Sequence, residues 1–279
     1  MLLRDFLREG TAALEALYPA EEARRTVQLL CQELLGVQSY THVISPEYAI
    51  PPQQEPLLAD ALRRLASGEP LQYVTGWAPF YGRRFRVTPS VLIPRPETEL
   101  LVQEAVRLGG RNVLDLCTGS GCIAWSVALE LPGARVTGVD VSEEALAVAR
   151  GQQFPAAPTP TFVRADVLDT AQDFPYGPFD LILSNPPYVL EREKAQMRPN
   201  VLEHEPALAL FVPDTDPLLF YRAIAAWSQR FLTPEGKGLT EINQDLGPQT
   251  EALFRSAGFS QTRVLQDWFG RDRFVYYAR

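Results

Sequence analysis

Apolar and polar positions follow two different patterns along this chain. Up to about residue 70, apolar side chains recur at helical spacing, as at Leu3, Phe6, Leu7 and Leu14. From about residue 91, short apolar runs typical of buried strands alternate with stretches of helical length. The pattern therefore predicts a small helical domain followed by a larger α/β domain.

The second part of the chain predicts a parallel sheet. Strands are expected at 112–116, 135–139, 161–164, 179–184 and 238–242, and helices near 97–108, 122–131, 142–150, 215–230 and 246–257. Such alternation is typical of a sheet with helices on both faces. Residues 262–265 and 273–277 follow each other without a helix, so the sheet is expected to close with an antiparallel hairpin.

The segment between the two parts has the character of a linker. Residues 73–76 and 85–88 flank a turn-rich stretch, which predicts a β-hairpin. The proline-rich residues 155–160 are expected to form a loop. The expected parts are a helical, substrate-recognising domain at 1–70, a β-hairpin linker at 71–90 and an α/β domain at 91–279.

Composition places the chain among ordinary globular proteins. Hydrophobic residues make up 46% and charged residues 22%, and no apolar run approaches the roughly 18 residues of a membrane span. The amino terminus soon becomes charged and amphipathic, so neither a signal peptide nor a membrane partner is expected, and a cytoplasmic location follows. The three cysteines and two histidines lack zinc-type spacing, so no metal site is expected.

The charge balance weakens the case for a nucleic-acid partner. The net charge is −8, and the first 70 residues carry six Arg and ten acidic side chains. Phosphate contacts need clustered Lys and Arg. Direct binding of nucleic acid is therefore not expected.

A glycine-rich loop follows the first predicted strand of the α/β domain. Residues 117–121 read Cys-Thr-Gly-Ser-Gly, and a predicted helix begins directly after them. Glycines let a backbone approach a ligand closely, and a helix N-terminus offers free N–H groups. Asp140 ends the next strand, where a carboxylate can accept both ribose hydroxyls of an adenosine. This predicts a nucleotide site, although the Gly-x-Gly-x-x-Ala spacing also fits a dehydrogenase.

Two observations favour S-adenosylmethionine as the nucleotide. Asp115 ends the first strand, where its carboxylate can face the cationic methionine portion of that cofactor. The expected antiparallel hairpin is typical of the methyltransferase version of this fold. Asp166 follows the third strand near the place where an adenine amine could lie; a role as helix N-cap or turn residue is an equally good interpretation.

The tetrapeptide Asn185-Pro186-Pro187-Tyr188 follows the apolar strand 179–184. The residue before a proline is held in an extended conformation, and two successive prolines remove two backbone donors. The Asn185 side-chain oxygen and the Pro186 carbonyl can then each accept one hydrogen of an –NH₂ group, while Tyr188 packs on its flat face. A proline-rich turn is the alternative interpretation. At the mouth of a nucleotide-binding sheet, the segment indicates methyl transfer to an amide or to a base amine.

These motifs resemble the HemK-type family of peptide chain release factor N5-glutamine methyltransferases, which are class I methyltransferases. The resemblance covers nearly the whole chain and rests on residues 68–76, 92–99, 113–121 and 185–188. Asn-Pro-Pro-Tyr alone is shared with adenine and cytosine amine methyltransferases. The Ile-Pro-Arg-Pro-Glu-Thr-Glu stretch within 92–99 is much more selective for this family.

The resemblance implies a Rossmann-like seven-stranded sheet and a target in the Gly-Gly-Gln motif of class 1 release factors. It also implies that Phe80, Arg95 and Pro96 lie near the cofactor, with an Arg95–Glu97 ion pair as the other interpretation, and that Glu205 and Pro206 shape the substrate mouth. S-adenosylmethionine would be bound by Cys117, Thr118, Gly119, Ser120, Gly121, Asp140, Asp166, Val167 and Asn185, and the glutamine by Asn185, Pro186, Pro187 and Tyr188, with Asn185, Pro186 and Tyr188 as catalytic residues.

The chain departs from the family pattern at three places. Cys117 replaces the first glycine of the loop, which the fold tolerates if that position keeps φ below zero. Val167 stands where some relatives place an aromatic ring that stacks on adenine. Residues 240–243 are more polar than the usual end of the fifth strand, and the sequence gives no reason for that.

Several other functions stay open at this point. A glutamine methyltransferase of a ribosomal protein has the same site chemistry, and a nucleic-acid adenine or cytosine amino-methyltransferase shares the tetrapeptide. A dehydrogenase would need a His or Lys near the nicotinamide, and no candidate stands out. A non-catalytic binding module is disfavoured because both the cofactor loop and the acceptor clamp are intact.

Overall fold

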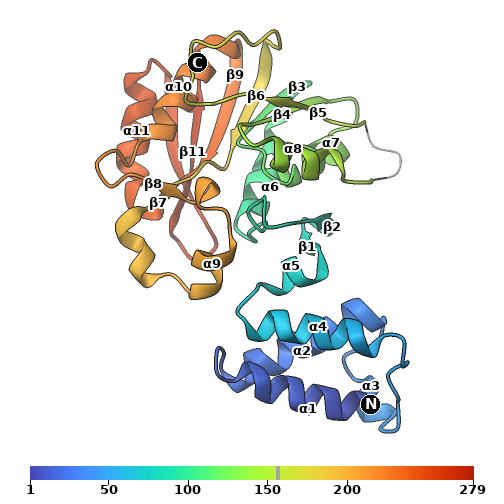
Figure 1. The fold of residues 1–279 in the computed structure, drawn as a ribbon. Coiled ribbons are helices and arrows are strands. Elements are labelled where there is room, and N and C mark those ends of the chain that lie inside the picture. Colours follow the sequence, from blue (N-terminus) through green and yellow to red (C-terminus); the bar gives the residue numbers. More distant parts are fainter. Residues whose placement is uncertain (155–157) are drawn as a thin grey trace. The chain divides into compact units, whose positions relative to one another are not determined.

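The computed structural model describes residues 1–154 and 158–279; residues 155–157 of the expected loop lie outside the described residues. The chain forms two compact units (Figure 1). The first consists of residues 1–77 with 198–204, and the second of residues 78–197 with 205–279. In the described part of the chain, every helix is too short or too polar to cross a membrane.

The first unit is helical, as its apolar spacing predicts. Its core is formed by one face of each long helix. The first two helices approach closely at Gly10, where a Cβ atom would lie 2.9 Å from Val27 Cγ1. Segment 198–204 joins this unit, where Arg198 Nη1 lies 2.7 Å from Glu22 Oε1. The helices are α1 (Leu3–Leu14), α2 (Ala20–Leu35), α3 (Thr41–Ile44), α4 (Glu55–Ala66), α5 (Leu71–Thr75) and, from the later segment, α9 (Pro199–His204).

The prediction of a strand at 73–76 is wrong, because residues 71–75 form the helix α5. Pro70 precedes the helix with φ −58°, and Gly76 ends it in the left-handed region at φ +79°. The helix lets Tyr73 bury its ring, which is 5% exposed. The short hairpin that follows consists of β1 (Trp77–Phe80) and β2 (Arg83–Arg86). Tertiary burial therefore overrides the β-propensity of Tyr73 and its neighbours.

The second unit is built on a seven-stranded sheet with the order β10-β11-β9-β6-β3-β4-β5. The strands from β9 to β5 in this order are parallel, whereas β11 pairs antiparallel with both β9 and β10. The α/β class and the closing hairpin are thus confirmed. The strands are β3 (Asn112–Leu116), β4 (Arg135–Asp140), β5 (Thr161–Arg164), β6 (Phe179–Ser184), β9 (Leu232–Glu241), β10 (Gln261–Gln266) and β11 (Asp272–Ala278).

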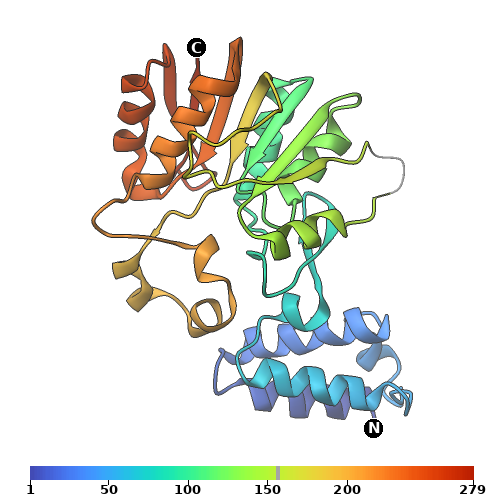
Figure 2. The same ribbon diagram turned by 45° about the horizontal axis from the view of Figure 1, so that its top comes forward.

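Apolar side chains fill both faces of this sheet. Along β6, Leu181 and Leu183 belong to one core cluster while Ile182 between them belongs to the other. The first cluster contains side chains of α6 (Thr98–Leu108), α7 (Cys122–Glu130) and α8 (Glu143–Arg150). The second contains those of α10 (Leu219–Phe231) and α11 (Gly247–Ser256). In Figure 2, α10 and α11, drawn in orange and red, lie apart from the green helices.

An insertion separates β6 from α10. It contains β7 (Val189–Leu190) and β8 (Phe211–Val212), which pair parallel to each other, and short 3₁₀ turns at Glu191–Gln196 and Ala207–Ala209. A further 3₁₀ turn, Gln244–Leu246, follows β9. The insertion thus begins directly after Asn185-Pro186-Pro187-Tyr188, at the carboxyl edge of the sheet.

Candidate active site

The polar groups singled out from the sequence meet at the carboxyl edge of the sheet. The glycine loop follows β3, Asp140 ends β4, Asp166 follows β5 and Asn185 follows β6. Because β3 lies between β4 and β6, the strand order reverses there, and such a switch point forms a crevice for ligands. A cavity of about 290 Å³ opens at this place, and all four features line it.

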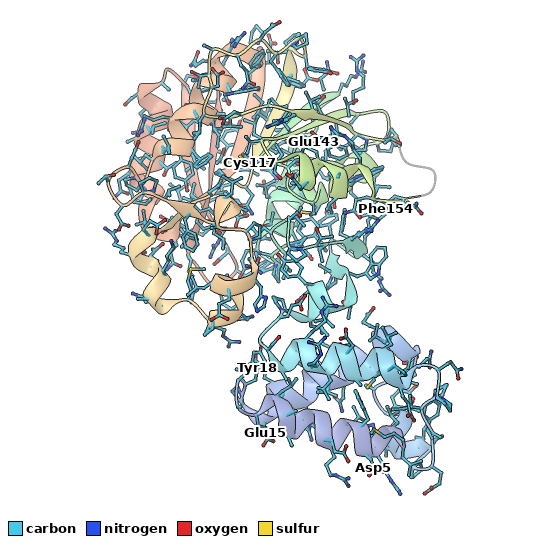
Figure 3. The ribbon with its side chains drawn as sticks, viewed as in Figure 1. Asp5, Glu15, Tyr18, Cys117, Glu143 and Phe154 are labelled. Atoms are coloured by element: carbon cyan, nitrogen blue, oxygen red, sulfur yellow. The ribbon has the colours of Figure 1, made fainter. Side chains whose placement is uncertain are left out.

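The loop is shaped by left-handed backbone conformations. Gly119 and Gly121 have φ of +54° and +78°, and a Cβ at Gly119 would meet no heavy atom within 4 Å. The expectation for Cys117 is wrong: its φ is +62°, so a side chain occupies the left-handed region that favours glycine. The sharp turn out of β3 requires this conformation, whatever residue stands there. Figure 3 labels Cys117 in the middle of the α/β unit, where it lines the cavity.

Asp115 supports the loop from beneath and is not one of the residues that line the cavity. Its Oδ2 accepts hydrogen bonds from Thr118 Oγ1 at 2.6 Å and from the Ala124 N–H at 3.2 Å. Burial raises the pKa of this carboxyl to about 7, although both hydrogen bonds lower it. The expectation that Asp115 faces the cofactor is therefore wrong, because the side chain is fully buried under Thr118.

Asp140 connects the end of β4 to the glycine loop. Its Oδ2 accepts the Gly119 N–H at 2.9 Å, and its Oδ1 accepts the Ser142 N–H at 3.0 Å. Burial raises the pKa of Asp140, against these backbone hydrogen bonds, which lower it. A carboxylate has about four acceptor positions, so lone pairs remain for two hydroxyl donors from the cavity.

Asp166 and Val167 form the far end of the cavity beyond β5. Asp166 is exposed, and its Oδ1 accepts the Leu168 N–H at 2.9 Å, which is the turn role considered from the sequence. Val167 is buried, and its carbonyl accepts the Trp227 indole N–H at 3.0 Å. An apolar side chain next to a carboxylate suits a flat base with an amine at its edge.

The tetrapeptide contributes unequally to the cavity. Asn185 and Pro187 line it, whereas Pro186 and Tyr188 are outside the set of lining residues in the described part of the chain. The Tyr188 hydroxyl donates to Glu241 Oε1 at 3.1 Å, and the Asn243 side chain donates to the Tyr188 carbonyl at 3.2 Å. The catalytic roles assigned to Pro186 and Tyr188 stay predictions.

The polar end of β9, unexplained by the sequence, supports this segment. Glu241 is 1% exposed, and besides Tyr188 it accepts the Thr98 hydroxyl at 2.8 Å. Thr98 in turn accepts a hydrogen bond from Asn185 Nδ2 at 3.0 Å. Sequence reasoning assigned no role to Thr98 or Glu241. The one available signal was the polar stretch 240–243, where the family pattern has a less polar end of the strand.

Arg95 lines the cavity and is held by Glu205, which is itself outside the set of lining residues. Arg95 Nη2 lies 2.6 Å from Glu205 Oε1, and the Ile93 N–H donates to Glu205 Oε2 at 3.2 Å. The Arg95 partner is thus Glu205. Arg95 and Pro206 line the cavity, while Pro96 is not among its lining residues. Phe80 is 1% exposed in the first core cluster, so its expected position beside the cofactor is wrong.

These residues fit the adenosine portion of a cofactor. The open backbone at Gly119 leaves room for a ligand, Asp140 retains acceptor capacity for a ribose, and the wall of the cavity is mostly apolar. Among the described residues, no group of three or more His, Cys, Asp or Glu side chains is arranged to hold a metal ion.

The sheet order, with its antiparallel β11 and the glycine loop at the switch point, defines the class of fold as that of the Rossmann-like methyltransferases. A solved structure with this fold is the T. thermophilus 16S rRNA N2 G1207 methyltransferase in complex with AdoMet and guanosine, with a TM-score of 0.52 at 21% identity, covering 73% of this chain and 49% of that chain. Residues 96–205 match the family described as Methyltransferase small domain, and residues 5–76 match the PrmC N-terminal domain.

Comparison with curated proteins identifies the family. A release factor glutamine methyltransferase of Bacteroides thetaiotaomicron is 43% identical over 94% of this chain and 95% of its own length. A protein of the same name from Flavobacterium psychrophilum is 37% identical over 99% and 98%, and one from Chlorobaculum tepidum is 38% identical over 96% and 94%. The chain belongs to the release factor glutamine methyltransferase family.

Proposed function

We propose that this protein methylates the side-chain amide nitrogen (N5) of the glutamine in the Gly-Gly-Gln motif of class 1 peptide chain release factors, with S-adenosyl-L-methionine as methyl donor. The observation that carries the proposal is Asn185 on the wall of the cavity, at the carboxyl edge beside the glycine loop. Full-length similarity to proteins named release factor glutamine methyltransferase supports the choice of substrate.

The donor is held by groups at the ends of β3, β4 and β5. The loop 117–121 approaches it through residues 117–120, while Gly121 packs against the core. Asp140 accepts the ribose hydroxyls, and Asp166 with Val167 receives the adenine. Fully formed acceptors that need no rearrangement favour binding because little ordering entropy is lost on association.

The substrate amide is held by Asn185 and Pro186. The Asn185 side-chain oxygen and the Pro186 carbonyl each accept one hydrogen of the –NH₂ group, which turns the nitrogen lone pair toward the methyl group. When bound, S-adenosylmethionine supplies a sulfonium methyl: an N–C bond forms, the S–C bond breaks with its electron pair left on sulfur, and the nitrogen then releases one proton to water or a carbonyl. Alignment of this kind can supply on the order of 7 kcal/mol or more.

The partner we propose is a release factor, recognised with the help of the helical domain at 1–70. Residues 71–90, which contain α5 and the β1–β2 hairpin, link that domain to the catalytic domain at 91–279. Since release factors act on ribosomes, the place of action is the cytoplasm. No direct contact with nucleic acid is part of the proposal, in keeping with the net charge of −8.

The test is a methyl-transfer assay with labelled S-adenosylmethionine. The substrates are a class 1 release factor, the same factor with its Gly-Gly-Gln glutamine replaced, ribosomal proteins and ribosomal RNA. Label on the intact factor that disappears with the glutamine is the expected result. Label on RNA or a ribosomal protein alone, or label that does not depend on that glutamine, would overturn the proposal.

A further inference from the structure

A chain of hydrogen bonds links β9 to the tetrapeptide through α6. Glu241 Oε2 accepts the Thr98 hydroxyl at 2.8 Å, and Thr98 Oγ1 accepts Asn185 Nδ2 at 3.0 Å. Thr98 is 2% exposed and Glu241 is 1% exposed, so water competes little for these contacts. Along the sequence, Thr98 is 87 residues from Asn185 and 143 residues from Glu241.

The direction of each hydrogen bond follows from the Glu241 carboxylate, which is the last acceptor in this series of hydrogen bonds. An ionised carboxylate has no proton to give, so the single hydroxyl proton of Thr98 must point to Glu241. The oxygen of Thr98 then has only lone pairs left for Asn185. The atom of the Asn185 side chain that faces Thr98 is therefore the NH₂ group, and the carbonyl oxygen Oδ1 is left for a ligand in the cavity.

We propose that Glu241 and Thr98 are positioning residues that fix the Asn185 amide with its oxygen toward the substrate. This inference rests on the proposed function, in which that oxygen accepts a hydrogen of the substrate amide. An Asn185 turned the other way would present NH₂ to NH₂ and repel the substrate. An amide alone has no strong preference between the two orientations, so the chain of hydrogen bonds supplies the selection.

Glu241 also holds the second half of the tetrapeptide. Its Oε1 accepts the Tyr188 hydroxyl at 3.1 Å. One carboxylate thus receives both hydroxyls, one on each oxygen, and connects the two ends of the segment. Because both partners donate, the arrangement needs an ionised carboxylate, and an amide at this position would have to direct its NH₂ at one of two donors.

The decisive variant is Thr98→Val, which keeps the side-chain shape and removes the hydroxyl. We expect kcat for methylation of a release factor to fall by about 10²-fold, because the acceptor loses its fixed orientation. The affinity for S-adenosylmethionine, measured by calorimetry, should change little. Thr98→Ser restores the hydroxyl and is expected to recover most of kcat, a rescue that a purely structural role of the methyl group does not predict.

The matched control is Thr250→Val on α11. Thr250 is fully buried, and its hydroxyl has no hydrogen-bond partner among the described residues. The same chemical change there should leave kcat as in the wild type. Glu241→Gln provides a second test, with a fall in kcat similar to that of Thr98→Val.

A measurement without substrate keeps the inference falsifiable if a variant is inactive for other reasons. In ¹⁵N–¹H spectra, the Asn185 NH₂ pair, assigned by its loss in Asn185→Asp, should exchange with water faster in Thr98→Val than in the wild type. Wild-type kcat in Thr98→Val, or an unchanged NH₂ exchange rate, would overturn the inference. If the wild type itself does not methylate the glutamine, the proposed function fails instead, and the exchange measurement still tests the orientation.

Discussion

Asp140 Oδ2 accepts the backbone N–H of Gly119 at 2.9 Å, so the residue that ends β4 also fixes the glycine loop that follows β3. One side chain thus contributes to the pocket twice, as part of the loop geometry and as a proposed ribose acceptor. The two functions are inseparable in any variant that removes its charge.

Asp140→Asn should weaken binding of S-adenosylmethionine. An amide would direct an NH₂ group at either the Gly119 or the Ser142 N–H, and hydrogen bonds to a charged group are each worth about 1.5–3 kcal/mol. We expect the dissociation constant to rise by about 10- to 100-fold, measured by calorimetry. Asp169→Asn is the control, since Asp169 is exposed and does not line the cavity. Equal affinities of Asp140→Asn and wild type would contradict the assignment.

Asn185→Ala should abolish transfer while cofactor binding is largely retained. The loop 117–121 and Asp140 still hold the donor, but the substrate amide loses its acceptor. Loss of one aligned hydrogen-bonding group of this kind typically lowers kcat by about 10²–10³-fold. Single-turnover methylation and calorimetry on the same preparation separate the two effects. Near-normal turnover would show that this side chain does not hold the amide.

The contribution of Glu241 to the stability of the protein should fall as the pH rises toward 7. Burial raises the pKa of Glu241 to about 7 from an ordinary 4.5. The folded state therefore binds this proton more tightly than the unfolded state. The contribution to stability is complete below pH 4.5 and is lost as the pH rises through 7. It amounts to about 3 kcal/mol, from roughly 1.4 kcal/mol per pKa unit.

Denaturant unfolding of Glu241→Gln and wild type between pH 4.5 and 8 measures this contribution. The difference in unfolding free energy between the two should shift in favour of the variant as the pH rises. Glu235→Gln, an exposed position on the same strand, is the control and should track the wild type. A pH-independent difference between Glu241→Gln and wild type would contradict the raised pKa.

The same titration should appear in the reaction, because only ionised Glu241 accepts both hydroxyls. We expect kcat to rise with pH through about 7 in the wild type and this rise to vanish in Thr98→Val. Several groups face Glu241. The hydrogen bonds from Thr98 and Tyr188 and the charge of Arg273 lower its pKa, whereas the charge of Glu97 raises it. Tyr221 and Cys122 are further neighbours. If the increase of kcat with pH persists in Thr98→Val, the group that titrates is not Glu241.

Cys117→Val should be destabilising well beyond the effect of Cys117→Gly. A left-handed backbone costs a side-chain-bearing residue about 1–2 kcal/mol, and a β-branched residue tolerates it worst. Cys117 has φ of +62°, so glycine relieves this strain while valine increases it. Thermal unfolding of both variants tests this. Cys31→Val, at a buried position inside the helix α2, serves as the control and should cost much less than Cys117→Val. Similar costs at the two sites would argue against strain at Cys117.

The local sequence predicted most of the second unit. The apolar runs of β3 and β6, and the glycines after β3, each express a preference that acts over a few residues. Their order along the chain, strand and helix in turn, restricts the topology to a parallel sheet. Short-range patterns therefore sufficed for the fold class and for the carboxyl edge as the place of the site.

The preferences of individual side chains failed where their surroundings in the fold decided the conformation. Tyr73 and its neighbours have β-forming side chains, yet they form α5 because Pro70, Gly76 and burial of the Tyr73 ring favour a helix. Cys117 adopts a positive φ because the chain must turn between β3 and α7, and this requirement is stronger than the preference of the residue.

What the sequence by itself determined was the class of chemistry, since Asn185-Pro186-Pro187-Tyr188 and the glycine loop carry their functional groups within a few residues. Only the tertiary structure decided how these groups are oriented. Thr98 and Glu241 are 143 residues apart, and neither belongs to a pattern that points to the other. Hydrogen-bond direction depends on which donor and acceptor become buried together, and that is settled when α6 packs against β9 of the sheet.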